Sequence, residues 1–404
     1  MLNGKNFQSP KESEEAVLKF WRENKIFEKS VNKKSKRGDF SFYDGPPFAT
    51  GLPHYGHILA SVIKDAIPRY QTMKGFRVKR RWGWDCHGLP VEYELEKELN
   101  LKTKKDIENF GVKNFNERAK SFVLKYTDEW KRIIPRIGRW ADMENDYKTM
   151  DWHYTESIWW VFKKLYDKNL IYEGYKSMHI CPRCETTLAN FEVSQGYKEI
   201  TDISITAKFK LAEEKNTFVL AWTTTPWTLP GNTALAINPE INYAKIKSEN
   251  GEIYILAKNR IESLAPNQKV LEIFSGKKLI GKKYEPLFKY YLDDKNLKNK
   301  ENGWKIYPAD FVTIDEGTGV VHIAPAFGED DMNLSQKHNL PFIQHVSMNG
   351  KFKKEVKNFA GFNVKPRENP QSTDIEIIKW LSANNKLFSK QKIIHSYPHC
   401  WRCD

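Results

Sequence analysis

Apolar residues recur at helical spacing over several segments in the first 170 residues of the chain. This spacing predicts helices over residues 11–29, 58–74, 114–134 and 152–169. Short runs at residues 40–44 and 76–82 are typical of strands, and a further helix is expected from Pro90. The resulting β-α-β-α order predicts a Rossmann-like parallel sheet, in which ligands bind beyond the carboxyl ends of the strands.

The pattern becomes strand-like after Cys184. Turn residues separate apolar runs at residues 203–206, 218–222, 234–237, 253–256 and 319–323, and one short helix is expected over residues 372–381. We therefore predict an α/β protein in which a β-rich domain, residues 201–388, is inserted after a Rossmann-like part, residues 1–180. Residues 181–200 and 389–404 are expected to form a small module between them.

Charge and apolar length limit the classes of protein that the chain can belong to. Lysine and arginine exceed aspartate and glutamate by 14 over 404 residues. This excess suits a polyanionic partner, although a solvated lysine-rich surface explains much of it equally well. No apolar stretch is long enough to span a bilayer, and residues 1–10 lack the apolar core of a signal peptide. We expect a cytoplasmic protein.

Four of the five cysteines form two CxxC pairs. An odd number of cysteines without a signal peptide argues against a disulfide framework. Four thiolates can form a closed structural zinc site, and closing a flexible loop of roughly two hundred residues costs about 5 kcal/mol against about 10–16 kcal/mol from zinc. Two unrelated pairs of buried thiols, or a redox CxxC, are the alternatives. The proposed ligands are Cys181, Cys184, Cys400 and Cys403.

Two histidines lie three residues apart where the first predicted strand and loop lead into a helix. Free backbone N–H groups at such a junction favour an anion, so His54 and His57 are candidates to hold phosphates. On spacing alone they could equally be a polar helix start. Gly45 lets the backbone approach a ligand closely and Pro46 stiffens the loop. Asp85 is either a carboxylate suited to an ammonium group or an aspartate that stabilises a turn or caps a helix.

A second set of polar residues lies in the β-rich part. Residues 222–232, Trp-Thr-Thr-Thr-Pro-Trp-Thr-Leu-Pro-Gly-Asn, place hydroxyl groups between two tryptophans, and residues 317–331 contain a histidine and an acidic cluster. From the residues alone, the threonine run is most simply a strand and the acidic run a helix N-terminus.

Residues 44–51, the HxGH at 54–57 and residues 81–92 together resemble class I aminoacyl-tRNA synthetases, most closely the isoleucyl enzymes, and the resemblance covers nearly all of the chain. It implies that His54 and His57 contact the phosphates of ATP, which enters with Mg²⁺. It also implies that Asp85, with Gly45 and Pro46, binds isoleucine, that tRNA(Ile) is the partner, and that the protein is a monomer.

The resemblance further implies an editing site with a zinc module at the base of the insertion. Asp331 would anchor the α-ammonium group of a misacylated amino acid, and Trp227 and His322 would shape the pocket. A missing methylene is worth only about 1–3 kcal/mol in an apolar pocket, a case that isoleucyl enzymes exemplify, so valine passes the first pocket and a second must remove it. The ester and the attacking water would be positioned by Thr223, Thr224 and Thr225.

The KMSKS loop of the family and its anticodon-binding helices are absent from these residues. We therefore expect the N-terminal part of a longer enzyme, which alone activates isoleucine poorly but hydrolyses valyl-tRNA if the editing fold is intact. A valyl or leucyl sibling, a stand-alone editing hydrolase, and a nucleotidyltransferase that merely shares HxGH are the alternatives. Valyl enzymes usually carry Asn-Val-Thr-Gly before HxGH, and leucyl enzymes Ala-Phe-Gly in place of Cys-His-Gly.

Overall fold

Two helices, α1 (Pro10–Glu23) and α2 (Ile26–Asn32), open the computed structural model, which describes residues 9–401 and 403. Ser9 caps α1 by accepting a hydrogen bond from the Glu12 backbone N–H. Lys25 has a left-handed backbone with φ of 49°. The prediction of one helix over residues 11–29 is wrong at this point, because a left-handed residue ends the helical hydrogen-bond ladder.

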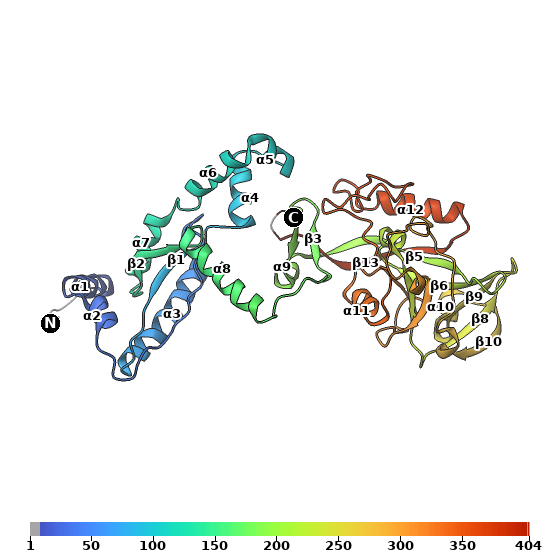
Figure 1. The fold of residues 1–404 in the computed structure, drawn as a ribbon, viewed down its shortest axis with the longest axis horizontal. Coiled ribbons are helices and arrows are strands. Elements are labelled where there is room, and N and C mark those ends of the chain that lie inside the picture. Colours follow the sequence, from blue (N-terminus) through green and yellow to red (C-terminus); the bar gives the residue numbers. More distant parts are fainter. Residues whose placement is uncertain (1–8, 402, 404) are drawn as a thin grey trace. The chain divides into compact units, whose positions relative to one another are not determined.

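Eight further elements follow in the first part of the chain (Figure 1). They are α3 (Tyr55–Met73), β1 (Arg81–Trp84), α4 (Leu89–Glu98), α5 (Lys104–Phe110), α6 (Val112–Phe122), α7 (Thr127–Arg136), β2 (Asp142–Lys148) and α8 (Trp152–Asp167). β1 and β2 pair in parallel, as the predicted α/β class requires. The helix predicted over residues 114–134 is divided between α6 and α7.

The strand predicted over residues 40–44 is wrong. This segment is extended but forms no ladder, and its surroundings pair with the rest of the fold only at isolated parallel bridges, Asp39 with Arg77 and Phe48 with Asp85. The strand predicted over residues 76–82 begins later, at Arg81. The bridges still place the loop before α3 beside the carboxyl end of β1.

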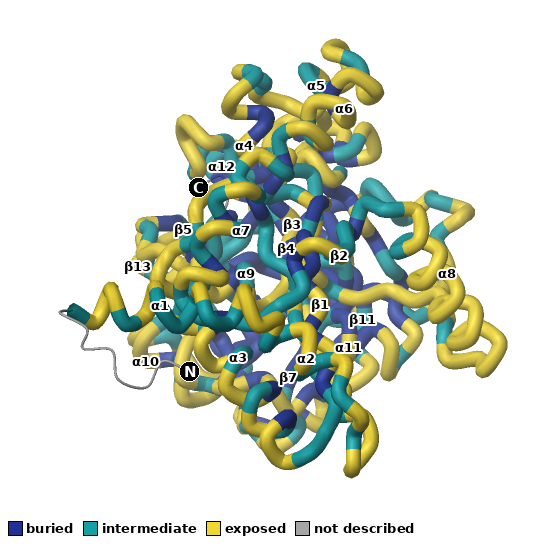
Figure 2. Tube along the Cα trace, turned by 90° about the vertical axis from the view of Figure 1, so that its left-hand side faces the viewer, coloured by how far each residue is buried: buried dark blue, intermediate teal, exposed yellow. Residues whose placement is uncertain are grey.

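The core of this part is aromatic. Trp82, Trp84 and Trp130 are almost fully buried and lie with their ring centroids 5.5–6.0 Å apart. In contrast, α8 contains no buried residue, and Figure 2 shows it as an exposed helix.

The second part begins with β3 (His179–Cys181), β4 (Thr186–Leu188) and α9 (Asn190–Ser194), and continues into a nine-stranded sheet. The strands are β5 (Tyr197–Lys210), β6 (Thr217–Thr223), β7 (Ala234–Ile237), β8 (Asn242–Lys247), β9 (Ile253–Ala257), β10 (Lys269–Ser275), β11 (Lys305–Pro308), β12 (Val320–Ile323) and β13 (Leu387–Pro398). The five predicted strand segments are confirmed, whereas β8, β10, β11 and β13 were not predicted.

The order of the sheet is β10-β8-β9-β6-β12-β7-β11, and β5 pairs with both β6 and β13. Helices α10 (Ile261–Leu264), α11 (Glu329–His338) and α12 (Ser372–Ala383), and the 3-10 turns η1 (Pro226–Gly231), η2 (Lys258–Arg260), η3 (Gly276–Leu279) and η4 (Lys300–Asn302), connect the strands. The helix predicted over residues 372–381 is confirmed as α12.

Two parallel neighbours in this sheet position the candidate editing residues. β6 and β12 run in the same direction, and Val321 lies opposite Trp222. The next residue of each strand, His322 and Thr223, therefore lies at the same edge of the sheet.

Packing divides the chain into two units, Met1–Glu173 and Gly174–Asp404. The predicted α/β class with a β-rich second part is confirmed. The predicted domain limits at residues 1 and 404 lie outside the described residues, and the division into three parts stays a prediction. Among the described residues, no helix has the length and apolar character needed to cross a membrane.

Candidate functional sites

The two histidines of HxGH form a reciprocal cap at the start of α3. The ring Nδ1 of His54 accepts a hydrogen bond from the Gly56 backbone N–H over 3.1 Å, and the Nδ1 of His57 accepts from the His54 backbone N–H over 3.3 Å. An Nδ1 atom that accepts carries no proton, so the proton of each neutral ring is on Nε2. The junction therefore presents two Nε2–H donors whose rings lie 3.7 Å apart.

His57 is held in the neutral form by its surroundings. Its ring packs edge-on against Trp130 at 4.9 Å. Burial lowers its pKa, and the nearby His54 and Lys64 lower it further. At neutral pH the ring is thus a hydrogen-bond donor through Nε2, a form that can bind a phosphate oxygen.

A pocket lies beside this helix start. It is lined by Gly45, Pro46 and His57, together with Lys64 and Arg139. A Cβ added at Gly45 would meet no other atom within 4 Å, so the space beside this residue is open. His54 is not part of this lining. The two cations both pair with Asp44, with 2.5 Å between Lys64 Nζ and the Asp44 carboxylate.

Asp85 lies directly after β1 and is half-buried. Its Oδ1 accepts long hydrogen bonds from the His87 backbone N–H, 3.4 Å, and from the Thr149 hydroxyl, 3.5 Å. Gly88, not Asp85, occupies the N-cap of α4. Asp85 is therefore not a helix cap, but its contact with the N–H two residues later is the turn interaction that the alternative also named, and Asp85 lies outside the pocket lining.

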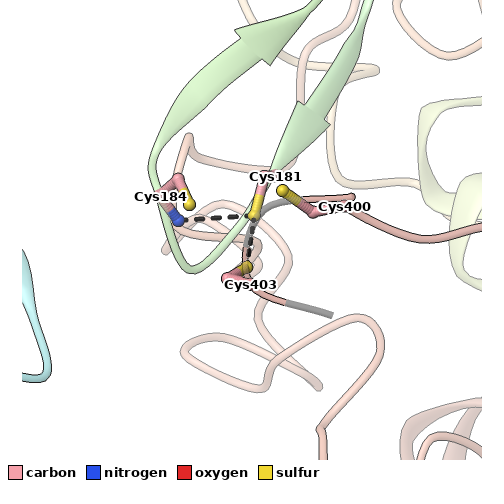
Figure 3. Close-up of side chains that lie close together, drawn as sticks. All are labelled: Cys181, Cys184, Cys400 and Cys403. Carbon is pink, nitrogen blue, oxygen red and sulfur yellow. Dashed lines mark hydrogen bonds between the residues drawn. The ribbon is translucent and has the colours of Figure 1, made fainter. Parts of the chain in front are cut away.

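The four cysteines of the two CxxC pairs converge. Cys181 ends β3, Cys184 lies in the following turn, and Cys400 and Cys403 follow β13 (Figure 3). All four sulfur atoms lie within 4.8 Å of one another, and 3.5 Å separates those of Cys181 and Cys403. A tetrahedral zinc ion with bonds of about 2.3 Å places its sulfur ligands about 3.8 Å apart. The four thiols fit such an ion.

Hydrogen bonds between the cysteines shift their pKa values in opposite directions. Hydrogen bonds from Cys184 and Cys403 lower the pKa of Cys181. The hydrogen bond to Cys181 raises the pKa of Cys184 and of Cys403, because each of these thiols keeps its proton to donate it, and burial raises both further. A donor set of four sulfurs suits zinc better than calcium or magnesium, which prefer oxygen ligands.

The threonine run lies at the end of β6 and in the loop after it. Thr223 ends the strand, and its hydroxyl lies 3.3 Å from that of Thr225 and accepts a hydrogen bond from the Thr225 backbone N–H. Thr224 is half-buried in the same loop. The expectation that the threonine run is a strand is therefore correct only for its first member.

His322 is brought next to this loop by β12. Its Nε2 lies 2.8 Å from the hydroxyl of Thr228, which in turn lies 3.3 Å from that of Thr225. His322 is 8 % exposed, and burial lowers its pKa to about 4. It is thus a neutral ring throughout the physiological pH range.

Asp331 lies in the first turn of α11, as the helix-start interpretation of the acidic run predicts. Its Oδ1 accepts a hydrogen bond of 2.6 Å from the backbone N–H of Ala324, two residues after His322. Burial raises the pKa of Asp331 to about 6, although the Ala324 contact lowers it. The carboxylate is therefore mostly ionised at pH 7 and lies close to the end of β12.

Trp227 packs edge-on against Phe327 with 5.3 Å between ring centroids. The backbone carbonyl of Trp227 accepts a hydrogen bond of 3.0 Å from His345 Nε2, and the ring of His345 lies 4.6 Å from Phe327. Burial lowers the pKa of His345 to about 4. These contacts fix one wall beside the threonine loop.

Three residues of this network were not predicted. Thr228 and Asn232 lie inside the segment that the sequence singled out, and Asn232 reaches His322 with 3.5 Å between its Nδ2 and the ring Nδ1. The hydroxyl of Tyr284 donates to Asn232 Oδ1 over 2.7 Å. The spacing of Thr228 in the loop could have indicated it, whereas nothing in the sequence connects Tyr284 to residue 232.

The sequence matches the family described as tRNA synthetases class I (I, L, M and V) over residues 16–393. The chain is 48 % identical to an isoleucine–tRNA ligase of Treponema denticola, covering 96 % of this chain and 38 % of that protein. It is 49 % identical to one of Chlamydia trachomatis serovar D, covering 97 % and 37 %. The chain thus spans less than two fifths of the length of these relatives.

Among solved structures, the crystal structure titled GlLeuRS-CP1 covers 46 % of this chain and 99 % of its own, with a TM-score of 0.33 and 15 % identity. At these values the likeness adds nothing to the assignment. The sequence match over most of the chain is sufficient, and the chain belongs to the class I tRNA synthetases of the isoleucine, leucine, methionine and valine group.

Proposed function

We propose that the chain is part of an isoleucine–tRNA ligase that also hydrolyses valyl-tRNA(Ile). Two relatives that are 48–49 % identical are isoleucine–tRNA ligases, and the chain covers under two fifths of each. Isoleucine, ATP with Mg²⁺ and tRNA(Ile) are the proposed substrates and partners. The monomeric state and cytoplasmic location expected from the sequence remain predictions.

For adenylate formation, we propose that the two Nε2–H donors of His54 and His57 bind ATP phosphates. These donors stabilise the charge that develops on the α-phosphate, which is a positioning and electrostatic role. Asp85 would bind the ammonium group of isoleucine, because its carboxylate is half-buried and accepts only long hydrogen bonds. Gly45 and Pro46 would form the rim of the pocket next to His57.

For editing, the observation that carries the proposal is the contact between the threonine loop and His322 on β12, with Asp331 of α11 bonded to Ala324 directly after that strand. The ionised Asp331 would pair with the α-ammonium of the misplaced amino acid. A water molecule would attack the ester carbonyl, and the tRNA ribose oxygen would leave and take up a proton. Thr223, Thr224 and Thr225 would orient the ester and the water, with Trp227 and His322 as walls of the site.

The four cysteines would hold a structural zinc ion. All four donors are protein thiolates, which leaves no open ligand position for substrate. The ion would fix the β3–β4 turn to the chain after β13. It supplies no chemistry to either proposed reaction.

The proposed editing role is tested by deacylation of valyl-tRNA(Ile) by the Asp331→Ala variant. We expect at least a tenfold loss in kcat/KM, because one charge-assisted contact to the ammonium is worth roughly 1.5–3 kcal/mol. Asp330→Ala is the matched control, since Asp330 is exposed in the same turn of α11. Equal rates for wild type and Asp331→Ala would remove Asp331 from the site.

A stand-alone editing hydrolase is the second candidate. The reciprocal cap of His54 and His57, with both Nε2–H groups presented at the start of α3, favours a retained nucleotide-binding role instead. Protection of these two imidazoles from diethyl pyrocarbonate by ATP would support the ligase. Modification at the same rate with and without ATP would favour the hydrolase.

A further inference from the structure

A hydrogen-bond chain runs from the threonine loop into the core of the β-rich unit and ends at Tyr284. Tyr284 is 3 % exposed and lies in the main hydrophobic cluster of the unit. Burial raises its pKa well above the ordinary value, so the hydroxyl keeps its proton and can donate. The chain contains Thr223, Thr225, Thr228, His322, Asn232 and Tyr284.

The orientation of the Asn232 amide is fixed by its neighbours. Its Nδ2 lies 2.8 Å from the Ala234 carbonyl oxygen, which can only accept, so the nitrogen must face this side. Oδ1 then faces Tyr284, whose hydroxyl donates to it. The second hydrogen of Nδ2 points toward His322 Nδ1 and the Ile323 carbonyl oxygen, each at 3.5 Å. A nitrogen that faces this donor carries no proton.

The contacts on the other side of the imidazole agree with this tautomer. The hydroxyl of Thr228 has one proton, and it is donated to the Thr225 carbonyl oxygen over 2.8 Å. Toward His322 Nε2, also at 2.8 Å, the Thr228 oxygen must therefore accept. Nε2 carries the ring proton. The Asn232 amide, held at both of its ends, thus fixes the neutral Nε2–H tautomer, and the Thr228 hydroxyl, which can rotate between acceptors, adjusts to it.

This tautomer sets the direction of the hydroxyl groups in the loop. Because the Thr228 proton is committed, the Thr225 hydroxyl, 3.3 Å away, donates to Thr228. The Thr223 hydroxyl in turn donates to that of Thr225 and accepts from the Thr225 backbone N–H. Each hydroxyl of the loop therefore donates its proton to the next group in the hydrogen-bond chain, toward the interior of the protein. What remains at Thr225 for a substrate is a lone pair, which accepts a hydrogen bond from an attacking water or an ammonium group.

We propose that Tyr284 is a positioning residue of the candidate editing site, which through Asn232 holds His322 as the Nε2–H tautomer and so keeps the loop hydroxyls as acceptors. This inference rests on the proposed editing function only for its catalytic consequence. The tautomer itself is a property of the free protein and can be measured without any substrate.

The test is ¹⁵N NMR of the histidine rings in the 404-residue chain, with His322 assigned by its absence in His322→Gln. Wild type is expected to show His322 only as Nε2–H. Tyr284→Phe leaves Asn232 Oδ1 a buried acceptor without its donor, so rotation of the amide is less opposed and a resolved fraction of Nδ1–H should appear. Deacylation of valyl-tRNA(Ile) by Tyr284→Phe should fall about three- to tenfold in kcat with KM unchanged.

Tyr243→Phe is the matched control. Tyr243 is equally buried in the same cluster, and its hydroxyl donates to the Gly319 carbonyl oxygen over 2.6 Å, away from His322. It should lose similar thermal stability while His322 stays fully Nε2–H. An Nδ1–H ring in wild type, which needs no variant to fold, would overturn the proposal. So would a Tyr284→Phe protein whose tautomer matches that of Tyr243→Phe. Absence of deacylation in wild type with the expected tautomer would contradict the proposed function instead.

Discussion

At the scale of single residues, the β-rich unit buries titratable groups that oppose one another. Burial lowers the pKa of His322 and of His345 to about 4 and raises the pKa of Asp331 and of Asp374 to about 6. The two histidines make the fold less stable as the pH falls, because they take up protons in the unfolded chain at a higher pH than in the native chain. The two aspartates make the fold more stable as the pH falls, because they take up protons in the native chain at a higher pH than in the unfolded chain. Between pH 4 and 6 the two effects largely cancel.

Replacing one of these four residues should make the free energy of unfolding depend on pH. His322 contributes stability that is complete above about pH 6.5 and is lost as pH falls toward 4, since its native pKa lies below its ordinary value. As the pH falls from 6.5 to 4, the free energy of unfolding of His322→Gln should therefore rise by up to about 3 kcal/mol relative to that of wild type. Urea unfolding at several pH values measures it, and a pH-independent difference would contradict the shift.

Asp331→Asn should give the opposite slope. The raised native pKa of Asp331 contributes stability that is full below about pH 3.8 and is lost as pH rises through about 6. The variant should thus become less stable than wild type, by up to about 3 kcal/mol, as pH falls from 6 to 4. The same series of urea titrations applies, and slopes of equal sign for both variants would be incompatible with the cancellation.

Residue types with strong local chemistry were the ones that sequence reasoning could select. The histidines of HxGH, the CxxC pairs and Asp331 carry recognisable spacing or lie at a helix start. Thr228 lies inside the threonine-rich segment, so its spacing could have indicated it, whereas Tyr284 carries no such signal, because a tyrosine is common in any buried strand. What gives Tyr284 its place is the hydrogen bond from its hydroxyl to Asn232, a residue 52 positions earlier in the chain, which no local pattern encodes.

At the scale of elements, one buried ion-pair cluster joins β5 and α12, and His395 of β13 lies beside it. Lys365 Nζ lies 2.6 Å from Asp202 on β5 and 2.7 Å from Asp374 on α12, and both carboxylates are at most 1 % exposed. His395 on β13 lies 3.6 Å from Asp202. Two buried carboxylates share this one lysine, so its loss leaves both without a cation.

Lys365→Met should therefore destabilise the β-rich unit by about 3–5 kcal/mol, the usual effect of leaving a buried charge unpaired. Lys379→Met is the matched control. Lys379 pairs with Glu376 on the surface of α12, the helix that contains Asp374, and such surface pairs contribute about 0–1 kcal/mol. Urea unfolding measures both. Equal losses of unfolding free energy in the two variants would show that the buried cluster contributes no more than a surface ion pair.

Element boundaries followed local signals and failed where tertiary context decides. The amphipathic pattern over residues 11–29 does not reveal that Lys25 adopts a left-handed conformation. The run at 40–44 has strand-like residues but finds only isolated bridges. β13 was missed because its burial pattern includes an exposed stretch, and its identity as a strand comes from the ladder with β5.

At the scale of the whole molecule, that same ladder explains how two CxxC pairs distant in sequence can meet. β5 and β13 pair from Ala207 with Leu387 to Tyr197 with Pro398, which returns the chain to the cysteines of the β3–β4 turn. The cost of closing a long flexible loop is thus largely met by folding of the sheet. The four proposed zinc ligands are thereby brought close together by the fold itself.

We expect one zinc ion per chain, and its loss in Cys400→Ser, as measured by inductively coupled plasma mass spectrometry. Cys86→Ser is the control, because Cys86 is a buried cysteine outside the cluster. A protein that contains no zinc after expression in zinc-supplemented medium, or the same zinc content in Cys400→Ser, would show that the four thiols are not a metal site.

The central claim is that the β-rich unit removes valine from tRNA(Ile). The most direct measurement is the rate at which the 404-residue chain deacylates valyl-tRNA(Ile) compared with isoleucyl-tRNA(Ile). We predict clear acceleration over the uncatalysed rate for the valyl ester and at least a tenfold lower rate for the isoleucyl ester. A folded chain that hydrolyses neither ester above background, or both equally, would contradict the account.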